Sequence, residues 1–317
     1  MQINQSTLAA LFRGYRTFFL EAYQGAPTTW DKIALRTPST AAQELYHWLG
    51  SVPGMRQLIG DVAIQNLSAS KYTISNEEWE STVAVKQTDI ERDTYGIYNP
   101  LMEAMGLAAR QHQDELIANL LLNGFTNTDY TGKAFFALNK KHEPYNSKSA
   151  TFSNLLTGAL SAATYETARA QIKSITNAAG RPMGLGLKLQ LIVPPALESV
   201  ARQILQGDFI QQTATNTAGT PGTAIAAASV SNVNKGTAEL IVWPQLAGND
   251  NAWFLLETAY PVRPLILQVE KEPTFESLTN PDSDHVFKKH EFLYQTYGRY
   301  NGGYGLPQLA IGSTGEG

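Results

Sequence analysis

Histidines with acidic neighbours are the residues of this sequence that could bind a metal ion. His285 and His290 lie five residues apart, close to Asp282 and Asp284, and imidazole and carboxylate groups are common zinc ligands. His142-Glu143 lacks the second histidine that a zinc protease places four residues after the first. Mixed charges of this kind are also usual where a strand begins. We therefore expect no metal site.

Nucleotide-binding and nucleophile motifs are incomplete in this chain. Gly184-Leu185-Gly186 precedes an apolar stretch instead of following one, and it lacks the third glycine of a dinucleotide-binding fingerprint. The sequence contains no P-loop, no Gly-x-Ser-x-Gly nucleophile elbow and no cysteine. His112 falls on an apolar helical stripe, which favours a core histidine over a catalytic base. The sequence thus predicts no catalytic residue, no cofactor and no enzymatic activity.

Composition narrows the class of protein further. The chain has 317 residues, 43% of them hydrophobic, and a formal charge of −4, which argues against a general nucleic-acid-binding surface. Arg13 and Arg16 interrupt the apolar residues near the N-terminus, so no signal peptide is expected. No run of 18 apolar residues occurs, so we expect no membrane partner.

The strongest structural signal is a long helix over residues 99–124. Asn99 suits an N-cap, Pro100 suits the first helical position, and Gly124 suits a left-handed stop after the last turn. An apolar stripe recurs at helical spacing along this segment. Its members are Leu101, Met105, Ala108, His112, Leu116 and Leu120, and Met102, Ala109, Ile117 and Leu121 widen the stripe to a full buried face. This spine helix is predicted to serve packing and not chemistry.

Three segments precede the spine helix. Residues 7–23 form an amphipathic helix, and residues 26–55 have large side chains, including Trp30, between turn residues, as in an extended arm. The strand pattern of residues 62–87 alternates around Trp79, and residues 75–78 could turn the chain back on itself. We therefore expect a long hairpin, which would need another surface to lie on because isolated hairpins are marginally stable.

Beyond the spine helix, the pattern changes to a mixed α/β domain that begins near residue 155. We expect a helix over 165–176 capped by Thr164, then an apolar strand over 187–193, then a helix that Gly207 ends. Apolar strands near 239–246 and 252–258 follow a low-complexity stretch at 211–237, and two further strands close the chain. An enzyme of α/β type, with a site in a crevice near residues 184–195, is one alternative.

This order of parts and several short motifs resemble the Mu-like prophage major head subunit family over almost the full length. Two departures are Val62, where the family is expected to have arginine, and Gln295-Thr296-Tyr297, which replaces a glycine-containing turn. The motifs that carry the resemblance are WDKIA at 30–34, PST at 38–40, WLG at 48–50, GD at 60–61, ESTV at 80–83, DIERD at 89–93, TNAAGRP at 176–182, LIVPPAL at 191–197, FL at 292–293 and GYG at 303–305.

The resemblance implies an α+β fold of the Hong Kong 97 type for phage major capsid proteins. Its parts would be an N-terminal helix and arm, an extended β-hairpin or E-loop, a peripheral domain with the spine helix, an axial α/β domain, and strands that return to the peripheral domain. The corresponding ranges are 1–55, 56–92, 93–154, 155–260 and 261–317.

The resemblance also implies a function. The protein would be the major head protein of a Mu-like tailed phage or prophage, assembling in the host bacterial cytoplasm as pentamers and hexamers of an icosahedral shell. The shell would enclose double-stranded DNA without sequence specificity, with separate scaffold, protease and portal proteins. No charged helical scaffold segment precedes the arm, so no long propeptide is expected. A minor head or tail structural protein is the other alternative.

Candidate intersubunit contacts follow from the expected hairpin and arm. Glu77, Glu78 and Lys71 near the hairpin tip could form charge pairs with an adjacent subunit. Trp79 and Trp30 could supply apolar anchors, because buried tryptophans often dominate the energy of an interface.

Overall fold

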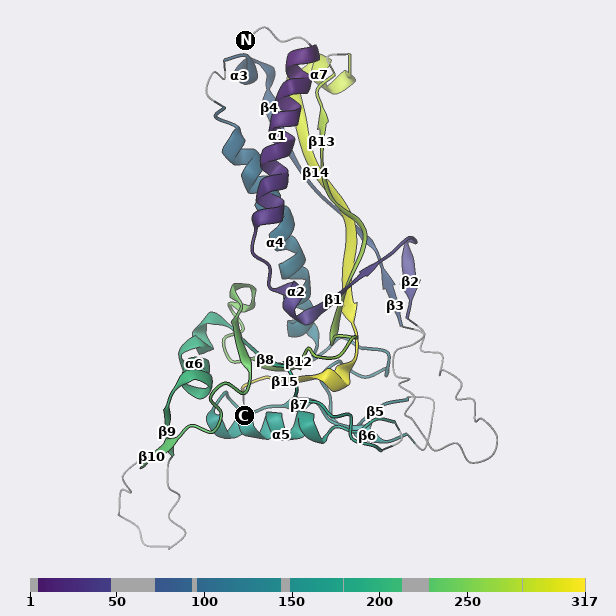
Figure 1. The fold of residues 1–317 in the computed structure, drawn as a ribbon. Helices are drawn as coiled ribbons and strands as arrows, with labels where there is room; N and C mark the ends of the chain where they lie inside the picture. The colour runs from purple at the N-terminus through teal and green to yellow at the C-terminus, as the bar shows by residue number, and fades with distance from the viewer. Residues whose placement is uncertain are drawn as a thin grey trace, which may run out of the picture.

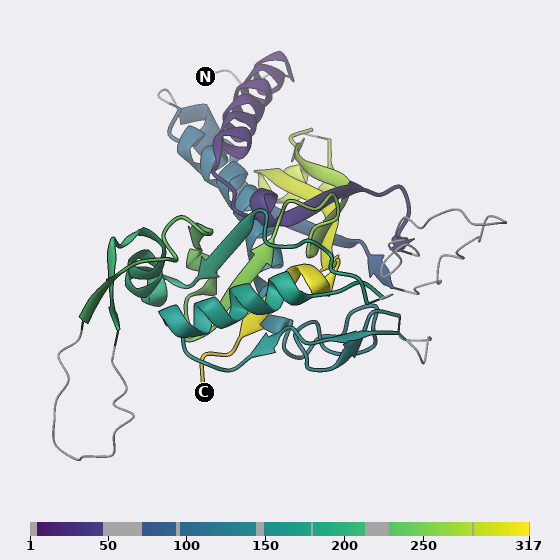
Figure 2. The same ribbon diagram turned by 60° about the horizontal axis from the view of Figure 1, so that its bottom comes forward.

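The computed structural model combines an elongated arm with a broader body at the end of that arm (Figure 1). It describes residues 5–46, 72–92, 96–143, 149–178, 180–212, 228–280 and 282–316. Two helices and a long sheet form the arm, and a second sheet lies in the body together with α5 and α6 (Figures 1 and 2). Lys71, one of the predicted contact residues, lies outside the described residues.

The sheet of the arm has four strands in the order β1-β13-β14-β4. β13 (Leu265–Leu278) and β14 (Glu291–Tyr304) form its antiparallel centre, and the short helix α7 (Asp284–Lys289) connects them at the far end. β1 (Ala34–Pro38) runs parallel to β13, and β4 (Glu77–Lys86) runs antiparallel to β14. Within the described chain, β4 is therefore an edge strand.

Two long helices cover one face of this sheet (Figure 1). They are α1 (Gln5–Gly25) and α4 (Asn99–Asn123), and the predicted N-terminal and spine helices are thereby confirmed. Alternate residues of β14 point toward them, as the two-residue period of a strand requires. The shared core contains Leu8, Tyr15, Phe19 and Tyr23 of α1, Met102 and Met105 of α4, and Val85, Phe275, Phe292 and Tyr294 of the sheet.

The ends and the buried face of α4 differ from the prediction. The N-cap residue is Tyr98 and not Asn99, and Gly124 has φ −64°, which is a right-handed and not a left-handed conformation. Ala108 is exposed, and Leu116 and Leu120 are only half-buried. The buried residues are Met102, Met105, Gly106, Gln113, Asp114, Ile117, Ala118 and Leu121. Met102, Met105, Ile117 and Leu121 of the expected face are thus confirmed as buried. The buried face extends further to Gln113, Asp114 and Ala118 because α4 packs between α1, the long sheet and the body.

Gly106 is where α1 and α4 come closest. A Cβ atom there would overlap the carbonyl oxygen of Phe19 and lie 3.1 Å from the amide nitrogen of Tyr23. Both obstacles are backbone atoms, so they cannot move aside as a flexible side chain would. The two helices can therefore pack at this distance only because residue 106 has no side chain.

Gly106→Ala should accordingly destabilise the subunit. Alanine favours a helix over glycine by about 1 kcal/mol. Forcing two packed helices apart costs about 1–3 kcal/mol. We expect the midpoint of urea unfolding to fall for Gly106→Ala and to rise for Gly14→Ala, because a Cβ at Gly14 of α1 meets nothing within 4 Å. Equal shifts in both variants would contradict this assignment.

The sheet of the body has five strands in the order β11-β8-β12-β15-β7. Two of its central strands are buried along their whole length, and they are apolar except for Gln190 and Glu257, because both faces are covered. The strands are β7 (Leu155–Leu156), β8 (Leu189–Val193), β11 (Glu239–Val242), β12 (Trp253–Glu257) and β15 (Ala310–Ser313). The predicted apolar strands near 187–193, 239–246 and 252–258 are confirmed as β8, β11 and β12.

Two different sets of residues cover the faces of this sheet. On one face, Leu191 and Leu255 share a core with α5 (Ala162–Ser174) and α6 (Glu198–Gln206). On the other face, Ile192 and Phe254 share a core with the C-terminal half of α4 and with Phe135 and Phe136. The end of the spine helix thus joins the arm to the body.

Two expectations about the body need correction. α5 begins at Ala162 and is capped by Ser161, whose side chain accepts a hydrogen bond from the amide of Thr164, so Thr164 is not the cap. Of residues 261–317, expected to return to the peripheral domain, β13 and β14 lie in the sheet of the arm, whereas β15 pairs with β12 and β7 in the sheet of the body. The cap is a local contact, and the partners of β15 are distant in the sequence.

The predicted turn at residues 75–78 is wrong. β3 (Thr73–Ser75) pairs with β2 (Gln43–Leu45), whereas β4 pairs with β14. β14 pairs with β4 along its whole length, from Glu77 to Lys86. Of the expected hairpin partner of β4, residues 62–74, residues 62–71 lie outside the described residues. The antiparallel β2–β3 pair instead brackets residues 46–72.

Short elements complete the described chain. They are α2 (Trp30–Ile33), α3 (Gln87–Arg92), the pairs β5 (Lys140–Lys141) with β6 (Thr151–Phe152) and β9 (Phe209–Gln212) with β10 (Ala228–Ser231), and the 3₁₀ turns η1 (Pro195–Leu197), η2 (Pro244–Leu246) and η3 (Pro307–Leu309). The segment expected to be an extended arm therefore contains α2, β1 and β2. Most of the low-complexity stretch, residues 213–227, lies outside the described residues.

Candidate interaction site between the spine helix and the edge strand

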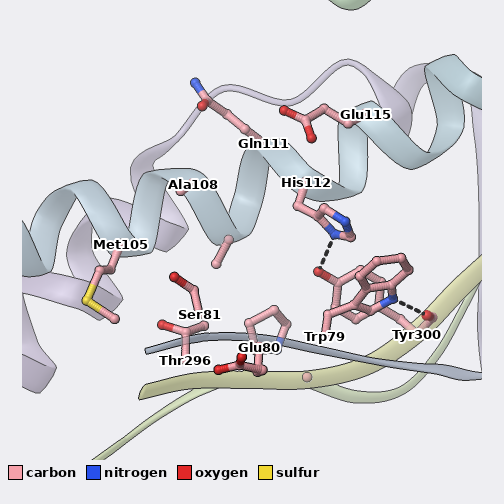
Figure 3. A pocket seen from close by; sticks show the side chains of 13 residues that line it. Trp79, Glu80, Ser81, Met105, Ala108, Gln111, His112, Glu115, Thr296 and Tyr300 are labelled. Atoms are coloured by element: carbon pink, nitrogen blue, oxygen red, sulfur yellow. Dashed lines mark hydrogen bonds between the residues drawn. The ribbon is translucent and has the colours of Figure 1, made fainter. Parts of the chain in front are cut away.

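A cleft of about 300 Å³ separates α4 from the edge strand β4 (Figure 3). α1 packs along α4, and the cleft lies between α4 and the long sheet. Its lining combines apolar side chains with polar ones (Figure 3). The residues that line it are Trp79, Glu80, Ser81, Met105, Ala108, Ala109, Gln111, His112, Glu115, Pro273, Thr296, Gly298 and Tyr300.

Trp79, His112 and Tyr300 form an aromatic cluster at one end of the cleft (Figure 3). The ring centroids of Trp79 and His112 are 4.3 Å apart. The indole Nε1 of Trp79 donates a hydrogen bond to the carbonyl oxygen of Tyr300 at 2.9 Å, and the Tyr300 hydroxyl lies 2.9 Å from Nδ1 of His112. Trp79 is half-buried, so part of the indole still faces the cleft. Hydrogen bonds within the subunit thus hold the cluster in place, and part of the Trp79 indole is exposed to solvent.

His112 gives the cleft a titratable group whose pKa is shifted by its surroundings. Burial lowers the pKa of His112, and the negative charge of Glu115 opposes this shift. The unfolded chain therefore takes up the proton more readily than the folded subunit does. The contribution of His112 to stability is complete above the unfolded pKa of about 6.5 and is lost as the pH falls toward the lower, folded pKa.

We accordingly expect His112→Gln to weaken the loss of stability on acidification. The free energy of unfolding, measured by denaturant titration on both sides of pH 6.5, should fall less steeply with decreasing pH in this variant than in the unsubstituted protein. His290→Asn is a suitable control, because His290 is exposed and has φ 54°, a conformation that asparagine tolerates. An unchanged slope in His112→Gln would contradict the pKa shift.

Beneath the cleft, Asp114 of α4 holds the start of α2. Its carboxylate oxygen Oδ1 accepts hydrogen bonds from the backbone amides of Thr29 at 2.9 Å and Trp30 at 2.7 Å. Burial raises the pKa of Asp114, and these two amides oppose the shift. A carboxylate from another helix thus caps α2, which has no side-chain cap of its own. Asp114 fixes the path of the chain into β1.

A second carboxylate, Glu272 of β13, connects the remaining elements of the arm. It accepts hydrogen bonds from the Tyr23 hydroxyl of α1 at 2.7 Å and from Nε2 of Gln113 of α4 at 3.4 Å, and it pairs with Arg36 of β1. Burial, together with Glu272, raises the pKa of Tyr23 to about 12. Glu272 therefore links both helices to two strands of the sheet.

The structure separates the residues predicted as intersubunit contacts. Glu77 and Glu78 are exposed on β4, and Trp79 is half-buried in the cleft. Trp30 is only 5% exposed, since its indole packs in the core with the guanidinium of Arg110 5.5 Å from the ring centroid. The prediction of Trp30 as a contact with another subunit is therefore wrong for this structure. α2 turns the indole inward.

The alternative crevice near residues 184–195 is held by a buried carboxylate. Glu257, which is 1% exposed, accepts hydrogen bonds from the amides of Gly186, Leu187 and Lys188 at 2.6, 2.8 and 3.1 Å. Each of these amides already has this partner, so the glycine-containing turn is a structural anchor. In the sequence, Glu257 is a single acidic residue at the end of an apolar strand, and nothing there indicates which amides it binds.

The described residues contain neither a cluster of metal-binding side chains nor a membrane-spanning helix. There, no three histidine, aspartate or glutamate side chains gather into a group that could hold a metal ion. Within the same residues, no helix is long and apolar enough to cross a membrane.

Comparisons with known proteins agree on one family. The profile of the Mu-like prophage major head subunit gpT family matches residues 8–162, 156–246 and 226–316. The major capsid protein of Escherichia phage Mu is 25% identical over 316 residues, which are 100% of this chain and 76% of that protein. A Mu-like prophage FluMu major head subunit of Haemophilus influenzae is 26% identical over 308 residues, which are 97% of this chain and 73% of that protein.

A solved structure extends the likeness to the fold. A chain from the procapsid of bacteriophage JBD30 superimposes with a TM-score of 0.58 and 29% sequence identity. The match covers 98% of this chain and 76% of the procapsid chain.

Proposed function

Because the chain belongs to the Mu-like prophage major head subunit family and is a phage major capsid protein, we propose that its copies form the pentamers and hexamers of an icosahedral head. The shell would enclose double-stranded DNA without reading its sequence. The chain is long and mixed α/β, as expected for a phage capsid subunit, and the procapsid chain of bacteriophage JBD30 has the same overall fold. That likeness over 98% of the chain is the observation that carries the proposal.

In the Hong Kong 97 type of capsid fold, the parts of this subunit would have the following roles. The arm, with α1, α4 and the four-stranded sheet, would be the peripheral domain. The five-stranded sheet with α5 and α6 would be the axial domain. Residues 46–72, bracketed by β2 and β3, would be the E-loop, which is shorter and begins earlier than the sequence pattern suggested.

The arrangement of these parts supports head-to-tail contacts. The β2–β3 pair lies on one side of the molecule, and α6 with the β9–β10 pair lies on the opposite side (Figure 1). Different surfaces on opposite sides allow each copy to contact the next by a heterologous interface, which closes into a ring when the rotation permits. Many such contacts per subunit would make a strong shell from individually weak interfaces.

The cleft between α4 and β4 is the surface we assign to the neighbouring copy. Trp79 offers a half-buried indole supported from below, and Glu77 and Glu78 offer exposed carboxylates on the same edge strand. Trp79 would anchor the contact, and the two carboxylates would select a basic partner surface. Lys71 of the neighbouring E-loop is a candidate for that surface.

Assembly would take place in the host bacterial cytoplasm and end in the virion. Scaffold, protease and portal proteins would be separate chains.

Particle size is the direct test of the proposed function. The purified protein should elute from a size-exclusion column as rings or larger assemblies, and negative-stain electron microscopy should show pentamers, hexamers or shells. A monomer or dimer that stays unassembled at high protein concentration, with and without co-expressed scaffold protein, would contradict the proposal.

A further inference from the structure

A fully buried lysine and aspartate meet in the segment that follows the spine helix. The side chains of Lys140 and Asp129 are both 0% exposed, and Nζ of Lys140 contacts Oδ2 of Asp129. The rings of Phe135 and Phe152 lie beside the amine, with centroids 5.6 and 5.8 Å from Nζ. Burying an ion pair in such surroundings costs several kcal/mol per ion before any attraction is counted.

The three neighbours of Nζ are all hydrogen-bond acceptors. Nζ donates to the carbonyl oxygens of Ala134 and Phe135, each 2.9 Å away, and to Oδ2 of Asp129. Transfer of the third hydrogen to Oδ2 leaves a neutral amine that keeps its two hydrogen bonds to the carbonyl oxygens. The lone pair of that amine then faces the carboxyl group.

The carboxyl group of Asp129 is also held in a defined orientation. Its Oδ1 atom accepts hydrogen bonds from the backbone amide of Thr131 at 2.8 Å and from the Thr131 hydroxyl at 2.5 Å. Two donors on one oxygen are the arrangement that stabilises an oxyanion during acyl transfer. The other oxygen, Oδ2, is the one that contacts Nζ. The two oxygens of this carboxyl group therefore have different environments.

Burial moves both groups toward their neutral forms. It lowers the pKa of Lys140 to about 8 and raises the pKa of Asp129, and in each case burial outweighs the attraction between the two partners. A desolvated lysine with a lowered pKa is a nucleophile, and the protonated carboxyl group is the form that can lose water. Fixed proximity supplies a large part of what such a reaction needs.

We propose that Lys140 and Asp129 join in an intramolecular isopeptide bond. Nζ attacks Cγ of Asp129, so the Nζ–Cγ bond forms and the Cγ–Oδ2 bond breaks. Oδ2 leaves as water, with its own hydrogen and one hydrogen from the amine. Oδ1 becomes the amide oxygen and keeps its two donors from Thr131, while the remaining N–H has a backbone carbonyl to bind. No oxidant or further reactant is required.

Intact-mass spectrometry of the denatured subunit tests this inference, whether or not the protein assembles. The folded protein, incubated at pH 8, should have lost the mass of one water molecule. A tryptic digest should contain a branched peptide that joins Asp129 to Lys140, with no cleavage after Lys140. A mass equal to that of the sequence would overturn the proposal.

Matched variants assign the bond to this pair. Lys140→Arg keeps a positive charge but cannot form the amide, so it should have the full mass whether or not it folds. Lys141→Arg changes the neighbouring, partly exposed lysine and should retain the loss of water. Thr131→Val removes the hydroxyl donor to Oδ1 and should slow the reaction. A loss of water that persists in Lys140→Arg would overturn the assignment.

Discussion

Leu121→Asp should prevent the subunit from folding. Leu121 is 0% exposed and packs where the spine helix meets the body, in the same core as Phe136 and Phe254. An aspartate there would be an unpaired buried charge, which costs several kcal/mol. That amount approaches the whole stability of an ordinary domain, about 5–15 kcal/mol. The variant should be insoluble or show no cooperative unfolding transition by circular dichroism.

The same substitution elsewhere on α4 separates burial from helix propensity. Leu107 is 39% exposed, so Leu107→Asp should leave a folded protein with nearly unchanged stability. Leu120 is half-buried, and Leu120→Asp should fall between the two. If Leu107→Asp were as damaging as Leu121→Asp, the helix itself and not its buried face would be the sensitive feature.

Trp79→Ala should leave a folded subunit that does not assemble. The substitution removes the hydrogen bond to the Tyr300 carbonyl and the contact with His112, which should lower the free energy of unfolding by about 1–3 kcal/mol. It also removes the apolar anchor of the cleft, and loss of a central interface tryptophan costs about 2 kcal/mol or more per contact. Because each subunit repeats the contact, the assembled fraction should fall steeply.

Two further variants distinguish lost assembly from lost stability. Glu77→Lys reverses an exposed charge on β4 without touching the core, so it should weaken assembly while the unfolding midpoint stays the same. Thr82→Ala lies on the same strand outside the cleft and should assemble normally. Size-exclusion chromatography and denaturant unfolding on the same preparations give both quantities. Normal heads from Trp79→Ala would exclude the cleft as the docking surface.

Local sequence patterns predicted the elements correctly where one residue type repeats along a segment. The run from Leu189 to Val193, in which Gln190 is the one polar residue, predicts β8 because a strand that is covered on both faces is mostly apolar. α4 followed from Pro100 and a long helical periodicity. These signals depend on neighbours within one turn or one pleat, so a single sequence contains them.

Those local patterns could not predict which distant segments pair with one another. β4 has the alternation of any half-buried strand, and nothing in it specifies β14, more than 200 residues later, as its partner. Asp114 and Glu257 look like ordinary acidic residues until their backbone partners are known. The inward direction of Trp30 likewise depends on the cap that Asp114 provides.

By itself, the sequence determined the spine helix, the α/β character of the C-terminal half and the family resemblance, because these reside in local periodicity and in short motifs along the chain. Only the tertiary structure decided which face of α4 is buried, that Trp79 borders a cleft while Trp30 does not, and that Lys140 meets Asp129. Each of these features depends on contacts between side chains of separate elements. The strength of such a contact depends on the local environment in the folded subunit and not on the spacing of the residues in the sequence.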